Sequence, residues 1–90
     1  MVDYKQIKNE LSTTINTIWS NPRYRSDKKK MWRTVEAWKQ IFELHRPENA
    51  WEENVLLAFQ NAVTYRIYNM ETADALAFIE YILEVMERVN

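Results

Sequence analysis

The stretch Lys29–Leu44, KKMWRTVEAWKQIFEL, decides the fold of this chain. Its large apolar residues recur at intervals of three and four, and this spacing puts them on one face of a helix. The pattern predicts a helix that begins after a cap at Ser26 or Asp27 and ends at the sequence HRPEN. The apolar stripe consists of Met31, Val35, Trp38 and Phe42, widened on one side by Ala37, Ile41 and Leu44.

The same periodicity recurs on both sides of this segment. Asp3, Asn49 and Thr72 stand where N-cap residues are expected, and Glu52 follows Asn49 at the spacing of a capping box. The third helix has the widest apolar face, so we expect it to be the most buried of the four. The four stripes together predict helices at about residues 4–19, 27–45, 50–68 and 73–89.

The composition narrows both the fold class and the chemistry. The chain has 90 residues, of which 47% are apolar, and it contains no glycine and no cysteine. Glycine-rich phosphate loops and dinucleotide fingerprints are therefore excluded, as are disulfides and thiolate metal sites. No run alternates with period two, and short loops make successive helices antiparallel neighbours. We predict one all-α domain, residues 1–90, folded as a small antiparallel four-helix bundle.

The location of the protein is inferred from the same features. The sequence MVDYKQIKNEL becomes polar within three residues, so it does not have the hydrophobic region of a signal peptide. No window approaches 18 uncharged apolar residues, the length at which a membrane-spanning helix is considered. The absence of cysteine mildly favours a reducing compartment. We expect the chain to be cytoplasmic.

An unusual concentration of positive charge lies at residues 21–34, NPRYRSDKKKMWRT. This stretch holds six of the 12 lysines and arginines, although the chain as a whole has a formal net charge of −1. Lysines at the start of a helix oppose its macrodipole, so a contact or a function is expected to compensate for them. We interpret the cluster as a site for a negatively charged partner, with a solvated turn as the alternative. The candidate binding residues are Arg23, Tyr24, Arg25, Lys28, Lys29, Lys30, Trp32 and Arg33.

The four tryptophans fall into different classes. Trp38 lies in the middle of one apolar stripe and Trp51 begins another, so we expect both in the core. Trp19, at a helix end, is undecided. Trp32 points toward the charged face of its helix, where a binding surface would display it. The alternative is that the segment 21–25 folds over Trp32 and covers it.

The remaining polar candidates favour ordinary roles. Glu80, Glu84 and Glu87 share one face of the last helix and form either a solvated surface or an acidic docking face. His45, the only histidine, is expected to help cap the last carbonyls of its helix. The Glu-x-x-His pattern of helical di-metal sites is absent. We therefore expect no metal and no cofactor.

These observations favour a non-enzymatic protein–protein interaction module, such as a small inhibitor, an immunity-type protein or an adaptor. The expected partner is a protein with an acidic surface. A second copy of the chain is one such partner, because the acidic face of the last helix complements the basic start of the second, which predicts a homodimer. The alternative is a nucleic-acid-binding accessory protein that uses the basic cluster 23–33, although a net negative chain argues against it.

Overall fold

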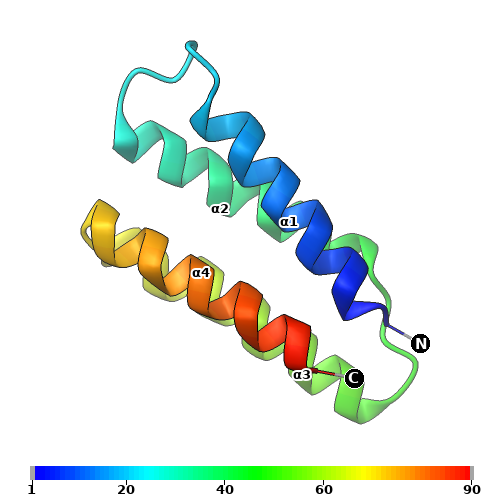
Figure 1. Cartoon of the computed structure of the whole chain (residues 1–90). Coiled ribbons are helices and arrows are strands. Elements are labelled where there is room, and N and C mark those ends of the chain that lie inside the picture. The colour runs from blue at the N-terminus through cyan, green and yellow to red at the C-terminus, as the bar shows by residue number, and fades with distance from the viewer. Residues whose placement is uncertain (1, 90) are drawn as a thin grey trace.

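The computed structural model describes residues 2–89, and these form a bundle of four α-helices (Figure 1). Successive helices run in opposite directions. The first two pack closely together, the fourth packs on the first, and the segment 50–69 packs on the second. The all-α four-helix bundle predicted from the sequence is confirmed. In chain order the helices are α1 (Tyr4–Trp19), α2 (Asp27–Leu44), α3 (Ala50–Asn61) and α4 (Thr72–Arg88).

Three of the helices begin at a side-chain cap that was predicted from the sequence. In each, a backbone N–H in the first turn, which has no partner within the helix, donates to an oxygen of the cap. Ser26 rather than Asp27 caps α2. The bonds run from Gln6 N to Asp3 Oδ1 (3.0 Å), from Lys29 N to Ser26 Oγ (3.2 Å) and from Glu52 N to Asn49 Oδ1 (2.9 Å).

The start of α4 differs from the expectation. Thr72 is not the N-cap but the first residue of the helix. The cap is Glu71, whose backbone is still extended (φ −63°, ψ 151°) and whose side chain makes no capping hydrogen bond. As a result α4 covers residues 72–88 instead of 73–89, and α2 also ends one residue earlier than expected, at Leu44.

The third predicted helix is not one uniform α-helix. Its α-helical part ends at Asn61 and continues as a wider π-helical turn, η1 (Ala62–Arg66), and a 3₁₀ turn, η2 (Ile67–Asn69). The sequence AVTYRIY in this region is rich in β-branched and aromatic residues, which have lower helix propensity. The helical segment expected over residues 50–68 is therefore present, but its last part is π-helical and 3₁₀ rather than α-helical.

The core confirms the central stripe of α2 but not the expected burial of α3. Trp38 has no exposed surface, and its Nε1–H donates to the carbonyl oxygen of Leu11 at 3.2 Å. In α3 only Glu52 and Leu56 are buried. Trp51, predicted to be a core residue, is 55% exposed. The apolar face of α3 is wider than the strip that α2 covers, so one flank of it stays in solvent.

Trp19 is resolved as a half-buried residue between α1 and α2. Its Nε1–H donates to Thr34 Oγ1 at 3.3 Å, and Lys30 Nζ lies 5.2 Å from the centroid of its ring. Cation–π contacts of this kind hold a lysine against an aromatic face. Within residues 2–89, no helix combines the length and apolar character needed to cross a membrane.

Candidate functional site

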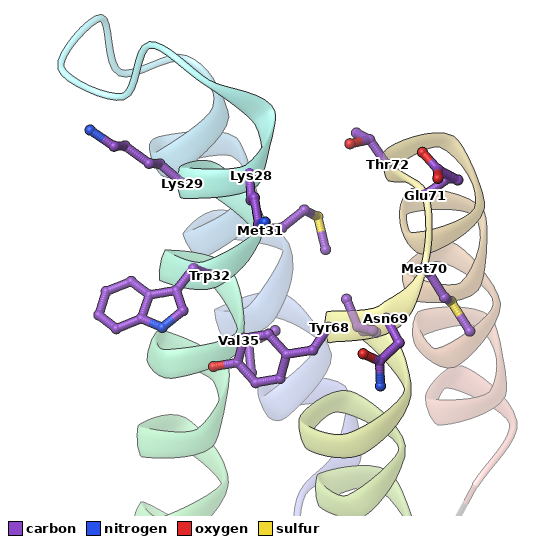
Figure 2. Close-up of a pocket in the computed structure, with 11 residues that line it drawn as sticks. Lys28, Lys29, Met31, Trp32, Val35, Tyr68, Asn69, Met70, Glu71 and Thr72 are labelled. Atoms are coloured by element: carbon purple, nitrogen blue, oxygen red, sulfur yellow. The ribbon is translucent and has the colours of Figure 1, made fainter.

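Trp32 is the centre of the candidate site. Its side chain is 56% exposed, so the segment 21–25 does not cover it. Figure 2 shows the indole projecting from α2, with the ring of Tyr68 reaching from η2 toward the same helix. An exposed tryptophan offers a large apolar contact area with few rotatable bonds, which is the chemistry of an interface anchor.

A hollow of about 620 Å³ lies between the first turns of α2 and the segment 67–72 (Figure 2). Met31, Val35 and Ile67, all buried, supply apolar surface to it. Lys28 and Lys29 are exposed and line it near the start of α2. We call this site the Trp32 hollow, and its defining residues are Lys28, Lys29, Met31, Trp32, Val35 and Tyr68.

Tyr68 is held in place by a hydrogen bond across the site. Its Oη donates to Glu36 Oε1 at 3.2 Å. Burial raises the pKa of Tyr68 above the ordinary 10.0, and the hydrogen bond to Glu36 and the charge of that carboxylate raise it further. The phenol therefore stays protonated at neutral pH and joins η2 to α2 beside Trp32.

Tyr68 was not among the residues predicted from the sequence. Its position depends on the π turn of η1, which changes the direction in which later residues point. No sequence pattern announces such a turn. The only signal was the aromatic composition of YRIY, and that signal does not specify which ring faces α2.

The basic cluster predicted at residues 23–33 lies around the start of α2, and its members face different directions. Lys28, Lys29 and Trp32 line the hollow together. Arg23 and Arg25 are exposed in the connection between α1 and α2, where Tyr24 is half-buried. The connection stands beyond the end of the bundle (Figure 1), and none of Arg23, Tyr24 and Arg25 is among the residues that line the hollow.

The last two members of the cluster face α1. Lys30 lies over the ring of Trp19. Arg33 is half-buried and lines a shallower hollow of about 390 Å³ between α1 and α2, together with Thr17 and Gln40. The spread follows from helical geometry: Lys29 and Lys30 are adjacent in the chain and point in different directions, and Arg33 lies about one turn after both.

The acidic residues of α4 are exposed, as a polar face would be. Glu80, Glu84 and Glu87 all face solvent. Glu87 also forms an ion pair with Lys8 of α1. The hydrogen bond from Lys8 and the charge of that lysine lower the pKa of Glu87. Part of the acidic face is thus already paired within the chain.

His45 has a different partner from the one expected. It is the C-cap residue of α2, and its backbone N–H donates to the carbonyl of Phe42 at 3.3 Å. Its side chain does not cap the helix but lies with Nε2 2.9 Å from Glu10 Oε2, which links α2 to α1. Across residues 2–89, no group of three or more His, Cys, Asp or Glu side chains is arranged to hold a metal ion.

A second hollow, of about 630 Å³, lies at the opposite end of the bundle, where Tyr4, Trp51, Glu52 and Val89 meet. The rings of Tyr4 and Trp51 pack edge to face, with centroids 6.4 Å apart. The hydroxyl of Tyr4 is buried and has no hydrogen-bond partner among the residues that the structure describes. Burial raises the pKa of Tyr4, and the charge of Glu52 raises it further.

Replacing Tyr4 with phenylalanine tests this buried hydroxyl. Because a buried polar group without a partner is costly, Tyr4→Phe is expected to raise the unfolding free energy at pH 7 by up to about 1 kcal/mol. The pKa of Tyr4 is raised in the folded state, so above pH 10.0 the phenol ionises more readily in the unfolded chain. The parent therefore keeps its full stability below pH 10.0 and loses part of it as the pH rises through the folded pKa. The advantage of the variant should therefore grow above pH 10.0.

Urea unfolding between neutral and alkaline pH measures both effects. Tyr65→Phe, at a residue that is 71% exposed, is the control and should stay within about 0.5 kcal/mol of the parent. A loss of 1 kcal/mol or more in Tyr4→Phe at pH 7 would show that the hydroxyl makes a stabilising bond.

The chemistry of the two hollows differs. The hollow at Tyr4 contains a carboxylate, that of Glu52, which is already hydrogen-bonded within the chain, whereas the Trp32 hollow combines an apolar floor, two ammonium groups and an exposed indole. The Trp32 hollow therefore suits the docking of an apolar side chain that has acidic neighbours. No family model, no curated protein and no solved structure matches this chain.

Proposed function

We propose that this chain is a non-enzymatic protein–protein interaction module, a small inhibitor, immunity-type or adaptor protein, and that it acts in the cytoplasm. It binds an acidic segment of a partner protein at the Trp32 hollow. The observation that carries the proposal is the exposure of Trp32 at the rim of an apolar hollow that also presents Lys28 and Lys29. Interface hot spots are enriched in tryptophan and tyrosine set in such surroundings.

The division of labour within the hollow follows from its chemistry. An apolar side chain of the partner enters over Met31 and Val35, and the indole of Trp32 covers it. Acidic residues of the partner meet Lys28 and Lys29, which steer the encounter more than they add to affinity. Tyr68 is already bonded to Glu36, so its ring is fixed before the partner arrives, which reduces the entropy lost on binding.

We do not extend the proposal to nucleic acid. A nucleic-acid surface needs cations along one continuous face, and here Lys30 and Arg33 face α1 while Arg23 and Arg25 stand in the connection. The formal net charge of −1 also argues against a nucleic-acid partner.

A matched pair of tryptophan variants tests the site. Trp32 and Trp51 are 56% and 55% exposed, but they lie at opposite ends of the bundle. Trp32→Ala is expected to weaken the partner complex by on the order of 2 kcal/mol, or about 30-fold in Kd, while Trp51→Ala leaves it unchanged. The partner is first captured from host lysate by the parent chain and identified by mass spectrometry, and Kd is then measured with purified components.

Kinetics and salt separate the modes of binding. Lys28→Gln with Lys29→Gln should slow association more than it speeds dissociation. A linear fall of log affinity with log salt, with a slope near −0.9 for each phosphate contacted, would instead identify a nucleic acid. Equal losses in Trp32→Ala and Trp51→Ala, or none in either, would refute docking at the Trp32 hollow.

A further inference from the structure

One long side of the bundle carries an exposed apolar surface that the proposed docking site does not use. It is formed by one flank of α3 and η1 and one flank of α4. Trp51, Tyr65 and Tyr81 on this surface are 55%, 71% and 61% exposed. We call it the α3/α4 face, and its defining residues are Trp51, Val55, Ala58 and Tyr65 on one flank and Phe78, Tyr81 and Val85 on the other.

The two flanks belong to one continuous surface. Near one end of the face, Arg66 Cζ lies 6.0 Å from the centroid of the Phe78 ring. Near the other end, Trp51 of α3 and Val89, the residue that follows α4, line the same hollow. Since α4 and the segment 50–66 lie next to each other near both ends, we infer that the half-buried Val55 and Phe78 and their neighbours share one side of the molecule.

The α3 seam is unusual because it carries no charge, although the charged Arg66 stands next to it in η1. Trp51, Ala58 and Tyr65 recur every seven residues, and Asn54 and Asn61 fill the intermediate positions of the same seam. All five are exposed. A solvated helix face normally bears charged residues, and an uncharged heptad seam is the pattern by which one helix packs against another. The small side chain of Ala58 leaves room for a close approach at the middle of the seam.

The α4 flank complements itself. Asp74 and Arg88 stand seven residues before and seven residues after Tyr81, and all three side chains are exposed. If a second α4 lies antiparallel on the first with Tyr81 at the centre, each Asp74 meets the Arg88 of the other copy. A two-fold interface requires this kind of self-complementary patch.

We propose that the α3/α4 face binds a second copy of this chain, in a two-fold arrangement in which α4 crosses its counterpart near Tyr81. The occupant is a second copy because the charges at the two ends of α4 match each other. Asp74 and Arg88 also complement the dipole of their own helix. Charge reversal at both positions distinguishes this role within one chain from pairing between two chains.

The size of the face sets the expected strength of the dimer. A helix of 17 residues is about 25 Å long, and two adjacent helices are about 20 Å wide, so each copy contributes roughly 500 Å². The total of about 1,000 Å² is at the lower limit for a specific interface. The dimer should accordingly form in the micromolar range.

This arrangement differs from a homodimer built on overall charge. Such a dimer would join Glu80, Glu84 and Glu87 to the cations at the start of α2, yet Glu87 is already paired with Lys8. The α3/α4 face leaves the Trp32 hollow open, so self-association and partner binding are independent.

Neighbouring residues on α3 provide the first test. Ala58 lies on the face, and Leu57, which is 45% exposed, points about 100° away around the helix. Sedimentation equilibrium should show the parent chain passing from 10.9 kDa to twice that mass across the micromolar range. Ala58→Arg should raise the dimer Kd by at least about tenfold, because it puts a long charged side chain into the uncharged seam that the second copy covers, and Leu57→Arg should leave it unchanged.

Charge reversal provides the second test and excludes a purely structural role. Arg88→Asp places two carboxylates opposite each other and should weaken the dimer, whereas Asp74→Arg combined with Arg88→Asp restores opposite charges between copies and should recover it. The double variant has the least favourable helix dipole, so recovery can come only from pairing between chains.

Circular dichroism confirms that each variant is folded before its mass is measured. A parent chain that remains a monomer at all concentrations would overturn the proposal, and so would equal dissociation by Ala58→Arg and Leu57→Arg. Failure of the double charge reversal to recover the dimer would refute the two-fold register at Tyr81.

Discussion

Trp38→Ala is expected to lower the unfolding free energy by about 3–5 kcal/mol, the range for truncating a large buried aromatic side chain. Trp38 has no exposed surface, and its ring lies among the side chains of α1, α2 and α4 that make up the core. Its Nε1–H also loses the carbonyl of Leu11 as a partner. Since small domains are stable by only about 5–15 kcal/mol, the variant should melt far below the parent or fail to fold.

Two further variants keep this prediction testable if Trp38→Ala does not fold. Trp38→Phe retains most of the apolar volume and should lose less stability while remaining folded. Trp32→Ala should stay within about 0.5 kcal/mol of the parent, because its ring is 56% exposed. Thermal melting of the three variants side by side ranks their stabilities. If Trp32→Ala proved as damaging as Trp38→Ala, the hollow at Trp32 would be part of the core rather than a docking site.

The same two residues show what the sequence could and could not predict. Periodicity identified the side chains that share a face, so the stripe with Trp38 at its centre and the position of Trp32 outside it both followed. Trp51 shares a face with core residues in the same way, yet it is 55% exposed. Whether the edge of a wide stripe is covered depends on how far the neighbouring helix reaches, and the pattern within one helix carries no information about that distance.

The candidate site was predicted only in part for a related reason. Lys28, Lys29 and Trp32 come from one helical turn, and the sequence placed them together. Tyr68 reaches them from a segment more than 30 residues away, after a π turn that changes the register of the chain. A contact of that kind depends on tertiary packing, which overrides local propensity.

Glu52 is a further case in which the sequence indicated only the local role. As expected from the capping-box spacing, its backbone N–H bonds to Asn49. The structure adds that its side chain is buried and that one carboxylate oxygen accepts the backbone N–H of Val2, which lies just before α1. The other oxygen accepts the Glu48 N–H at 3.3 Å and the Asn49 Nδ2–H at 3.2 Å. The carboxylate of Glu52 therefore links Val2 to the first turn of α3.

Glu52→Ala is accordingly expected to lower the unfolding free energy by about 2–3 kcal/mol, because buried donors lose a charged acceptor. Glu53→Ala removes a carboxylate of the same type from the adjacent, exposed position and should change it by no more than about 0.5 kcal/mol. Urea unfolding of the two variants measures this difference in unfolding free energy.

A spectroscopic titration of Tyr4 adds an independent readout. Burial is the main cause of the raised pKa of Tyr4, and the charge of Glu52 is the lesser one. Glu52→Ala should therefore lower that pKa only partway toward 10.0. Equal stability of the two alanine variants, with an unchanged Tyr4 titration, would mean that the carboxylate of Glu52 neither holds Val2 nor faces Tyr4.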